Sequence, residues 1–94
     1  MESAKSCWRP DRRVAWRAVD RRMVLVGGHE GRLFVLNETG AELWALVCET
    51  ASVQAMVSAL GRRFDVTEQI ARRDVVRFLE QLHNRGLVEP VESP

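Results

Sequence analysis

The chain has 94 residues, a length typical of one domain with its own hydrophobic core. Hydrophobic residues make up 46% of it and charged residues 29%, which is ordinary for a soluble globular protein. No apolar run approaches the roughly 18 residues of a membrane-spanning helix, and the polar start of the sequence has no signal-peptide core. We therefore expect a cytoplasmic protein that binds no membrane.

The charges are unevenly distributed along the chain. Residues 1–22 carry seven basic and three acidic groups, a net charge of +4, whereas residues 23–94 carry a net charge of −3. Because most of the chain is mildly acidic, we expect neither a large phosphate-binding face nor a nucleic-acid partner.

Three short strands are predicted first. Residues 14–19 (VAWRAV) alternate in polarity, residues 23–27 (MVLVG) are rich in β-branched side chains, and residues 32–36 (RLFVL) are apolar after their arginine. Residues 28–31 (GHEG) supply two glycines for a tight reversal. Because the connections are short, we expect an antiparallel meander.

Three helices are predicted next. Asn37 or Thr39 caps the first, Ser52 caps the second, and the third runs from Thr67 to the stop signal at Gly86. The second and third helices each carry apolar residues at helical spacing, which predicts a buried stripe. These expected core positions are Val53, Met56, Val57, Leu60 and Phe64, followed by Ala71, Val75, Phe78, Leu79 and Leu82.

This order of elements predicts an α+β fold. It is winged-helix-like, with a three-stranded antiparallel sheet followed by three helices. We expect residues 1–12 to form a flexible N-terminal tail, residues 13–89 to form the folded domain and residues 90–94 to form a C-terminal tail.

The residues that carry most enzyme chemistry are few and scattered. His29 is predicted in a turn and His83 on a helix surface, while Cys7 and Cys48 have no C-x-x-C spacing. The sequence also lacks a glycine-rich phosphate loop. We therefore expect no enzymatic activity, no metal site and no cofactor.

DNA binding is the alternative function. The second and third helices are joined by a short turn and resemble a helix-turn-helix, with Arg72, Arg73 and Arg77 available for phosphate contacts. The third helix also carries three acidic residues, which a recognition helix would normally lack. These arginines are more typical of a solvated helix face or of a flank that binds a peptide.

The strand at residues 32–36 suggests another use. As the last strand of a meander it has an open edge, and an exposed apolar edge invites aggregation unless it is shielded or used. A peptide can use such an edge by pairing its backbone with the strand; a second copy of the chain could do the same in a weak homodimer. On the helical wheel of the third helix, Val76 lies at the rim of the buried stripe with Arg72 and His83 on its side. This flank is a candidate second wall for a peptide, and a partly covered surface valine is the alternative.

Three segments resemble the PqqD family: LFVLNETGAELW (33–44), SVQAMVSALGRRFDV (52–66) and RRDVVRFLEQLHNRGLVE (72–89). The leucine–asparagine pair before the first helix, the tryptophan within it, the FDV turn and the apolar pattern of the third helix all fit. The resemblance extends over residues 13–89.

The resemblance implies a function. PqqD-like proteins are RiPP recognition elements, peptide chaperones that bind the leader of a ribosomally synthesised precursor peptide and present it to a modifying enzyme, often a radical SAM enzyme. The leader docks in the family as an added strand, against the third helix. Carried over by position, the leader-peptide-binding residues are Arg32, Leu33, Phe34, Val35 and Leu36 on the strand and Arg72, Arg73, Val76, Glu80 and His83 on the helix. A lasso-type leader peptidase as the enzyme, and a purely structural subunit of a larger maturase, stay open as alternatives.

Overall fold

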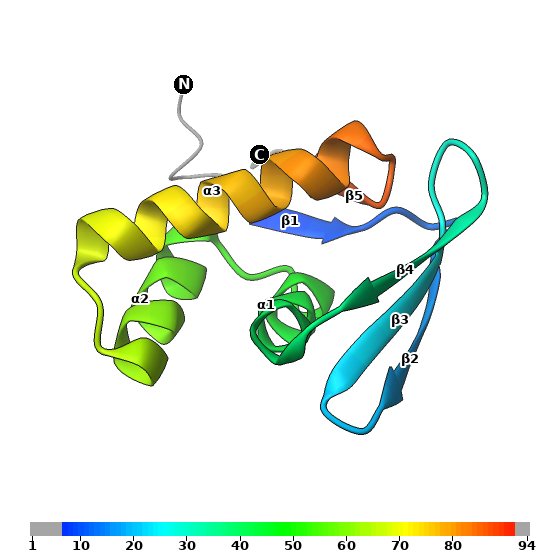
Figure 1. The fold of residues 1–94 in the computed structure, drawn as a ribbon. Helices are drawn as coiled ribbons and strands as arrows, with labels where there is room; N and C mark the ends of the chain where they lie inside the picture. The colour runs from blue at the N-terminus through cyan, green and yellow to red at the C-terminus, as the bar shows by residue number, and fades with distance from the viewer. Residues whose placement is uncertain (1–6, 92–94) are drawn as a thin grey trace.

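The computed structural model describes residues 7–91 and contains two small sheets and three helices (Figure 1). The elements in chain order are β1 (Cys7–Pro10), β2 (Ala15–Val19), β3 (Arg22–Gly27), β4 (Arg32–Leu36), α1 (Glu38–Cys48), α2 (Val53–Phe64), α3 (Glu68–Asn84) and β5 (Val88–Val91). The predicted α+β architecture, a three-stranded antiparallel sheet followed by three helices, is confirmed. No helix in the described part of the chain combines the length and apolar character needed to cross a membrane.

The three-stranded sheet has the strand order β2-β3-β4. Leu25 of β3 lies opposite Trp16 of β2 and Phe34 of β4, so these three side chains share one face. This inner face packs on the helices: Leu25 is fully buried, and the Trp16 ring meets Trp44 of α1 edge-on at a centroid distance of 5.5 Å. The opposite, outer face of the sheet is turned to solvent.

The helix ends follow the predicted capping residues. The Asn37 side chain accepts a hydrogen bond from the Gly40 N–H at 2.9 Å, which selects Asn37 rather than Thr39 as the cap of α1. Ser52 and Thr67 cap α2 and α3 in the same way. Each cap pairs a backbone N–H that the first helical turn leaves without a partner.

The core lies where the three helices meet the inner sheet face. Trp44, Val47, Met56 and Val75 are each fully buried there. Phe64 is an exception to the predicted stripe, because it lies at the end of α2 and is 43% exposed.

A second sheet was not predicted from the sequence. Cys7–Pro10, expected to belong to a flexible tail, pairs as β1 with β5, whose last residues 90–91 were also assigned to a tail. An Arg9–Glu89 ion pair at 2.7 Å links the two strands. The strands are too short to show a sequence period, and they pair with each other across nearly the whole length of the chain. The remaining parts of the predicted tails, residues 1–6 and 92–94, lie outside the described residues.

The connection between β3 and β4 is fixed against the end of α3. The His29 N–H donates a hydrogen bond to the Arg85 carbonyl at 3.0 Å. Gly28 has a φ of +82°, and a Cβ atom there would clash with the same carbonyl oxygen. This close approach holds the start of β4 beside the last turn of α3.

We predict that Gly28→Ala destabilises the protein more than Gly31→Ala. Both glycines have positive φ, so each substitution incurs about 1–2 kcal/mol of backbone strain. Only Gly28 adds a steric conflict, worth about 1–3 kcal/mol more, since a Cβ at Gly31 would meet no atom within 4 Å. Chemical denaturation measures both free energies of unfolding. Equal losses in the two variants would show that the Gly28–Arg85 approach does not constrain the fold.

Candidate functional site

The three-stranded sheet has two open edges within residues 7–91, one along β2 and one along β4, and the β4 edge is the one beside α3 (Figure 1). Residues Arg32–Leu36 pair with β3 along one side, and within residues 7–91 no strand lies along the other. The open edge expected from the sequence is therefore confirmed. In an antiparallel strand every second residue directs its N–H and C=O to the same side, so this edge presents unpaired donors and acceptors at alternate residues.

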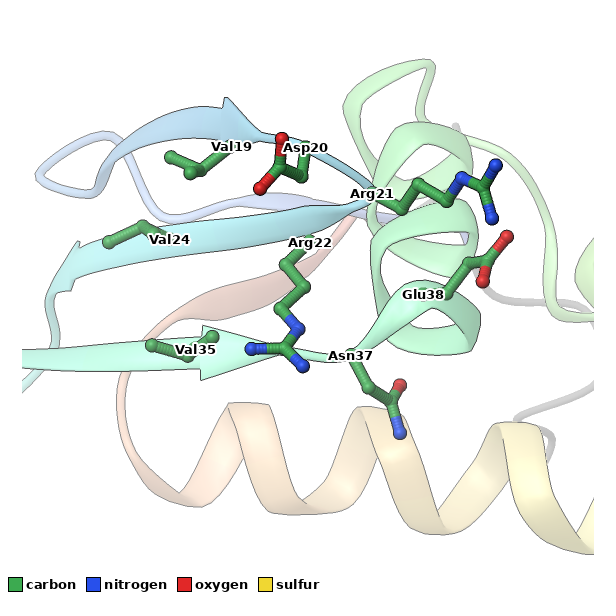
Figure 2. Close-up of a pocket in the computed structure, with 8 residues that line it drawn as sticks. All are labelled: Val19, Asp20, Arg21, Arg22, Val24, Val35, Asn37 and Glu38. Carbon is green, nitrogen blue, oxygen red and sulfur yellow. The ribbon is translucent and has the colours of Figure 1, made fainter.

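One flank of α3 lies beside this edge. In both views β4 is the strand of its sheet nearest to α3 (Figures 1 and 2). In the middle of the strand, the Arg85 guanidinium lies 5.2 Å from the centroid of the Phe34 ring. Beyond its end, Gly40 of α1 packs so closely that an added Cβ would lie 3.2 Å from the Leu36 Cβ and 3.6 Å from the Phe78 ring. The strand and α3 thus lie side by side, with Arg85 in contact at one end of the helix and Gly40 of α1 between Leu36 and Phe78.

A polar hollow lies between the start of β4 and the end of α3. Its volume is about 230 Å³. The lining residues are His29, Glu30, Arg32, Phe34, Asn84 and Arg85. Two arginines against one carboxylate give it a positive balance, and Glu30 already pairs with Arg32 at 3.2 Å. Such a hollow suits polar or acidic groups of a ligand.

An apolar hollow of about 330 Å³ lies at the other end of the strand, between α1, α2 and α3. Its lining residues are Asn37, Thr39, Gly40, Leu43, Leu60, Phe64, Val66, Asp74 and Phe78. Phe64, which the sequence analysis placed in the core, is therefore part of an open concave surface. This hollow suits an apolar side chain of a ligand.

The structure keeps the five predicted residues of β4 together at the edge. Phe34 and Leu36 face the helices and are half-buried, whereas Leu33 and Val35 project from the outer face of the sheet. An added strand would therefore pair with the backbone of alternate residues of β4 and meet side chains on both faces.

The predicted residues of α3 lie on the other flank of the helix. Arg72 donates hydrogen bonds to the side chains of Gln54 in α2 and Glu68, at 2.6 and 2.9 Å. The His83 ring packs edge-on against Trp8 of β1 at a centroid distance of 5.3 Å. These contacts turn Arg72 and His83 towards α2 and β1, so the structure does not bring them to β4.

The other three predicted helix residues share that distant flank. Val76 is partly buried and, with Arg72 and Arg73, lines a shallow surface hollow that includes Gln69. Glu80 is exposed and lies one helical turn beyond Val76. A helical wheel places residues at the two rims of a buried stripe but does not tell which rim faces which neighbour; in the structure these five residues lie on the rim away from β4.

The flank beside β4 is formed instead by Asp74, Phe78, Gln81 and Arg85. Their spacing of four, three and four residues places them along one side of α3. Contacts of Phe78 with Gly40 and of Arg85 with Phe34 fix that side against the strand. The sequence offered no signal for which flank of α3 faces β4, since Phe78 fits the core stripe equally well.

The rest of the described chain offers little reactive chemistry. No group of three or more His, Cys, Asp or Glu side chains between residues 7 and 91 is close enough to hold a metal ion. Cys7 and Cys48 are free thiols. Partial burial raises the pKa of the Cys48 thiol, and the neighbouring Glu49 carboxylate raises it further, so the reactive thiolate is disfavoured.

Two solved structures resemble this fold. One is described as TbiB1 in complex with the TbiA(beta) leader peptide; it has a TM-score of 0.82 and 26% identity over 90% of this chain and 99% of that one. The other, lasso peptide synthetase B1 complexed with the leader peptide, has a TM-score of 0.79 and 24% identity over 88% and 98% of the two chains. No curated protein sequence matches this chain.

The match to a family covers most of the folded residues. The family model described as coenzyme PQQ synthesis protein D (PqqD) matches residues 22–88, from the start of β3 to the first residue of β5. These residues include the β4 edge, all three helices and the α3 flank beside the edge. Because the match spans more than two thirds of the sequence, the chain belongs to the PqqD family.

Proposed function

We propose that this protein binds the leader of a ribosomally synthesised precursor peptide and presents it to a modifying enzyme. The observation that carries the proposal is the open edge of β4 beside the flank of α3, with a hollow at each end. Membership of the PqqD family supports it, and so do the two similar structures, each of which holds a leader peptide.

The leader would bind as a fourth strand of the sheet. Its backbone would pair with Arg32–Leu36, and its inward side chains would lie against Phe78, Gln81 and Arg85 of α3. The apolar hollow at Phe64 and Phe78 would receive one large apolar side chain, which would fix the register of the added strand. The polar hollow at Arg85 would receive polar or acidic groups nearer the other end.

The energetic balance favours a moderate, reversible complex. Ordering a disordered leader costs about 2–5 kcal/mol of the gross interaction energy. Each backbone hydrogen bond returns about 1 kcal/mol net, and burial of apolar side chains in the hollow adds to this. Because β4 is already paired with β3 along its whole length, little further ordering of the protein is needed.

The proposed role requires no catalytic residue in this chain. A chaperone that binds both the leader and the enzyme raises the effective concentration of the precursor at the active site, to about the millimolar range for short flexible linkers. The family resemblance suggests a radical SAM enzyme as the partner, and a lasso-type leader peptidase is the second candidate. In the absence of a leader, the same edge would be available for weak pairing with a second copy.

DNA binding is less well supported by the side chains of α3. Arg72 is already bound to Glu68 and Gln54, and Arg73 lies 3.8 Å from the Asp74 carboxylate. Phosphate contacts would compete with these partners. The family match and the two leader complexes also favour a peptide ligand.

We predict that Gln81→Trp blocks leader binding whereas Gln69→Trp does not. Both residues are exposed glutamines of α3, but Gln81 lies on the flank beside β4 and Gln69 lies on the flank of Val76. A tryptophan at 81 would occupy the space of the added strand and lower the affinity about tenfold or more, a loss of about 1.4 kcal/mol.

Titration calorimetry with a synthetic leader from the precursor gene nearest to this protein's gene measures both affinities. A loss with Gln69→Trp and none with Gln81→Trp would place the peptide on the opposite flank, next to Val76. Thermal unfolding of both variants controls for misfolding.

A second prediction concerns backbone pairing. N-methylation of single leader amides should weaken binding at every second position of the paired segment, since alternate N–H groups of an added strand donate to β4. Methylation at the intervening positions should have little effect. Competition binding with a set of singly methylated peptides gives the pattern, and a loss without a period of two would contradict strand addition.

A further inference from the structure

The outer face of the three-stranded sheet is unusually apolar. Each strand contributes to it: Val19 from β2, Val26 from β3 and Leu33 and Val35 from β4, with exposed fractions of 47, 44, 63 and 56%. Val24 lies between them and is partly covered. Figure 2 shows Val19, Val24 and Val35 side by side, one from each strand. Apolar side chains from all three strands thus share one exposed face, which makes it a candidate interaction site.

The face is also positively charged. Arg17 lies within it, opposite Val24, and Arg21 and Arg22 border it at the β2–β3 turn, where Asp20 is the single carboxylate. Among residues 7–91 these three arginines form no ion pair, whereas the nearby Glu38 is bound to Arg63. A partner with acidic side chains around an apolar centre would match this pattern.

A second copy of the chain fits the face poorly. Stacking two outer faces would bring the unpaired arginines of one copy against those of the other, which costs energy when water is excluded.

A leader bound to β4 would enlarge this same face. An added strand continues the sheet, and every second side chain of the leader would project beside Leu33 and Val35. We infer that the outer face and these leader side chains form one docking surface for the modifying enzyme, through an apolar patch on the enzyme that is bordered by acidic residues. This inference rests on the proposed leader binding.

The arrangement couples the two binding events. The enzyme contacts more surface when the leader is present, so it binds the chaperone–leader complex more tightly than the chaperone alone. By linkage the enzyme tightens leader binding by the same factor. The enzyme would thus bind mainly chaperone molecules that carry a precursor, and fewer that carry none.

The test uses the full chain, the synthetic leader and the maturation enzyme encoded in the same gene cluster. Calorimetry measures the enzyme's affinity for the wild-type protein, with and without leader, and for Arg17→Glu and Val26→Glu. We expect the leader to tighten enzyme binding at least about fivefold and each variant to weaken it about tenfold. Leader affinity, measured without enzyme, should stay within about twofold because neither residue lies on β4.

Arg62→Glu is the matched control. It changes the net charge by the same amount as Arg17→Glu and lies on α2, where it lines a different surface hollow; enzyme binding should be unchanged. Thermal unfolding shows whether each variant is folded. If Val26→Glu does not fold, Arg17→Glu still tests the inference.

Three results would overturn the inference. The first is that both outer-face variants, Arg17→Glu and Val26→Glu, bind the enzyme as tightly as the wild-type protein does. The second is that Arg62→Glu weakens enzyme binding as much as the outer-face variants do. The third is that the wild-type protein sediments as a dimer and Val26→Glu sediments as a monomer. That result would show that the outer face binds a second copy of the chain. Failure of the leader to bind the wild-type protein without enzyme would instead refute the proposed function itself.

Discussion

Along one side of β4, backbone N–H and C=O groups face solvent instead of another strand. Edges of this kind attract other chains, and many proteins protect them with charge, proline or a bulge. Here the strand is apolar except for Arg32, and within the described residues it is uncovered. The turn before it is held against the residue that follows α3, where the His29 N–H donates to the Arg85 carbonyl, and Leu36 at its end packs against Gly40 of α1. The edge is therefore accessible between two anchored connections, which suits strand addition.

Local signals in the sequence predicted most of the elements. Asn37, Ser52 and Thr67 each mark a helix start because their side chains pair a free N–H of the first turn. Residues 32–36 were predicted with their observed bounds, since glycines precede them and a cap follows. These features depend on a few neighbouring residues, and tertiary contacts did not override them.

Features that depend on distant contacts were missed. β1 has no sequence signal of its own because its partner, β5, lies at the other end of the chain. The position of Val76 on α3 was predicted correctly relative to the core, but its neighbours were not, because helical periodicity does not specify what packs on each rim. Phe64 fits the period of α2 and is nonetheless exposed, since α2 ends where a hollow opens. The family resemblance, in contrast, supplied the function that periodicity alone could not.

The account assigns different surfaces of one small sheet to different partners: the inner face to the core, the edge of β4 to the leader, and the outer face to an enzyme. Its central claim is that the edge is kept open for a peptide strand. Amide hydrogen exchange with and without the synthetic leader tests this most directly. The account predicts that the leader slows exchange at alternate residues of β4 and leaves the Val76 flank of α3 unchanged. Unchanged exchange throughout residues 32–36 in the leader-saturated protein would contradict it.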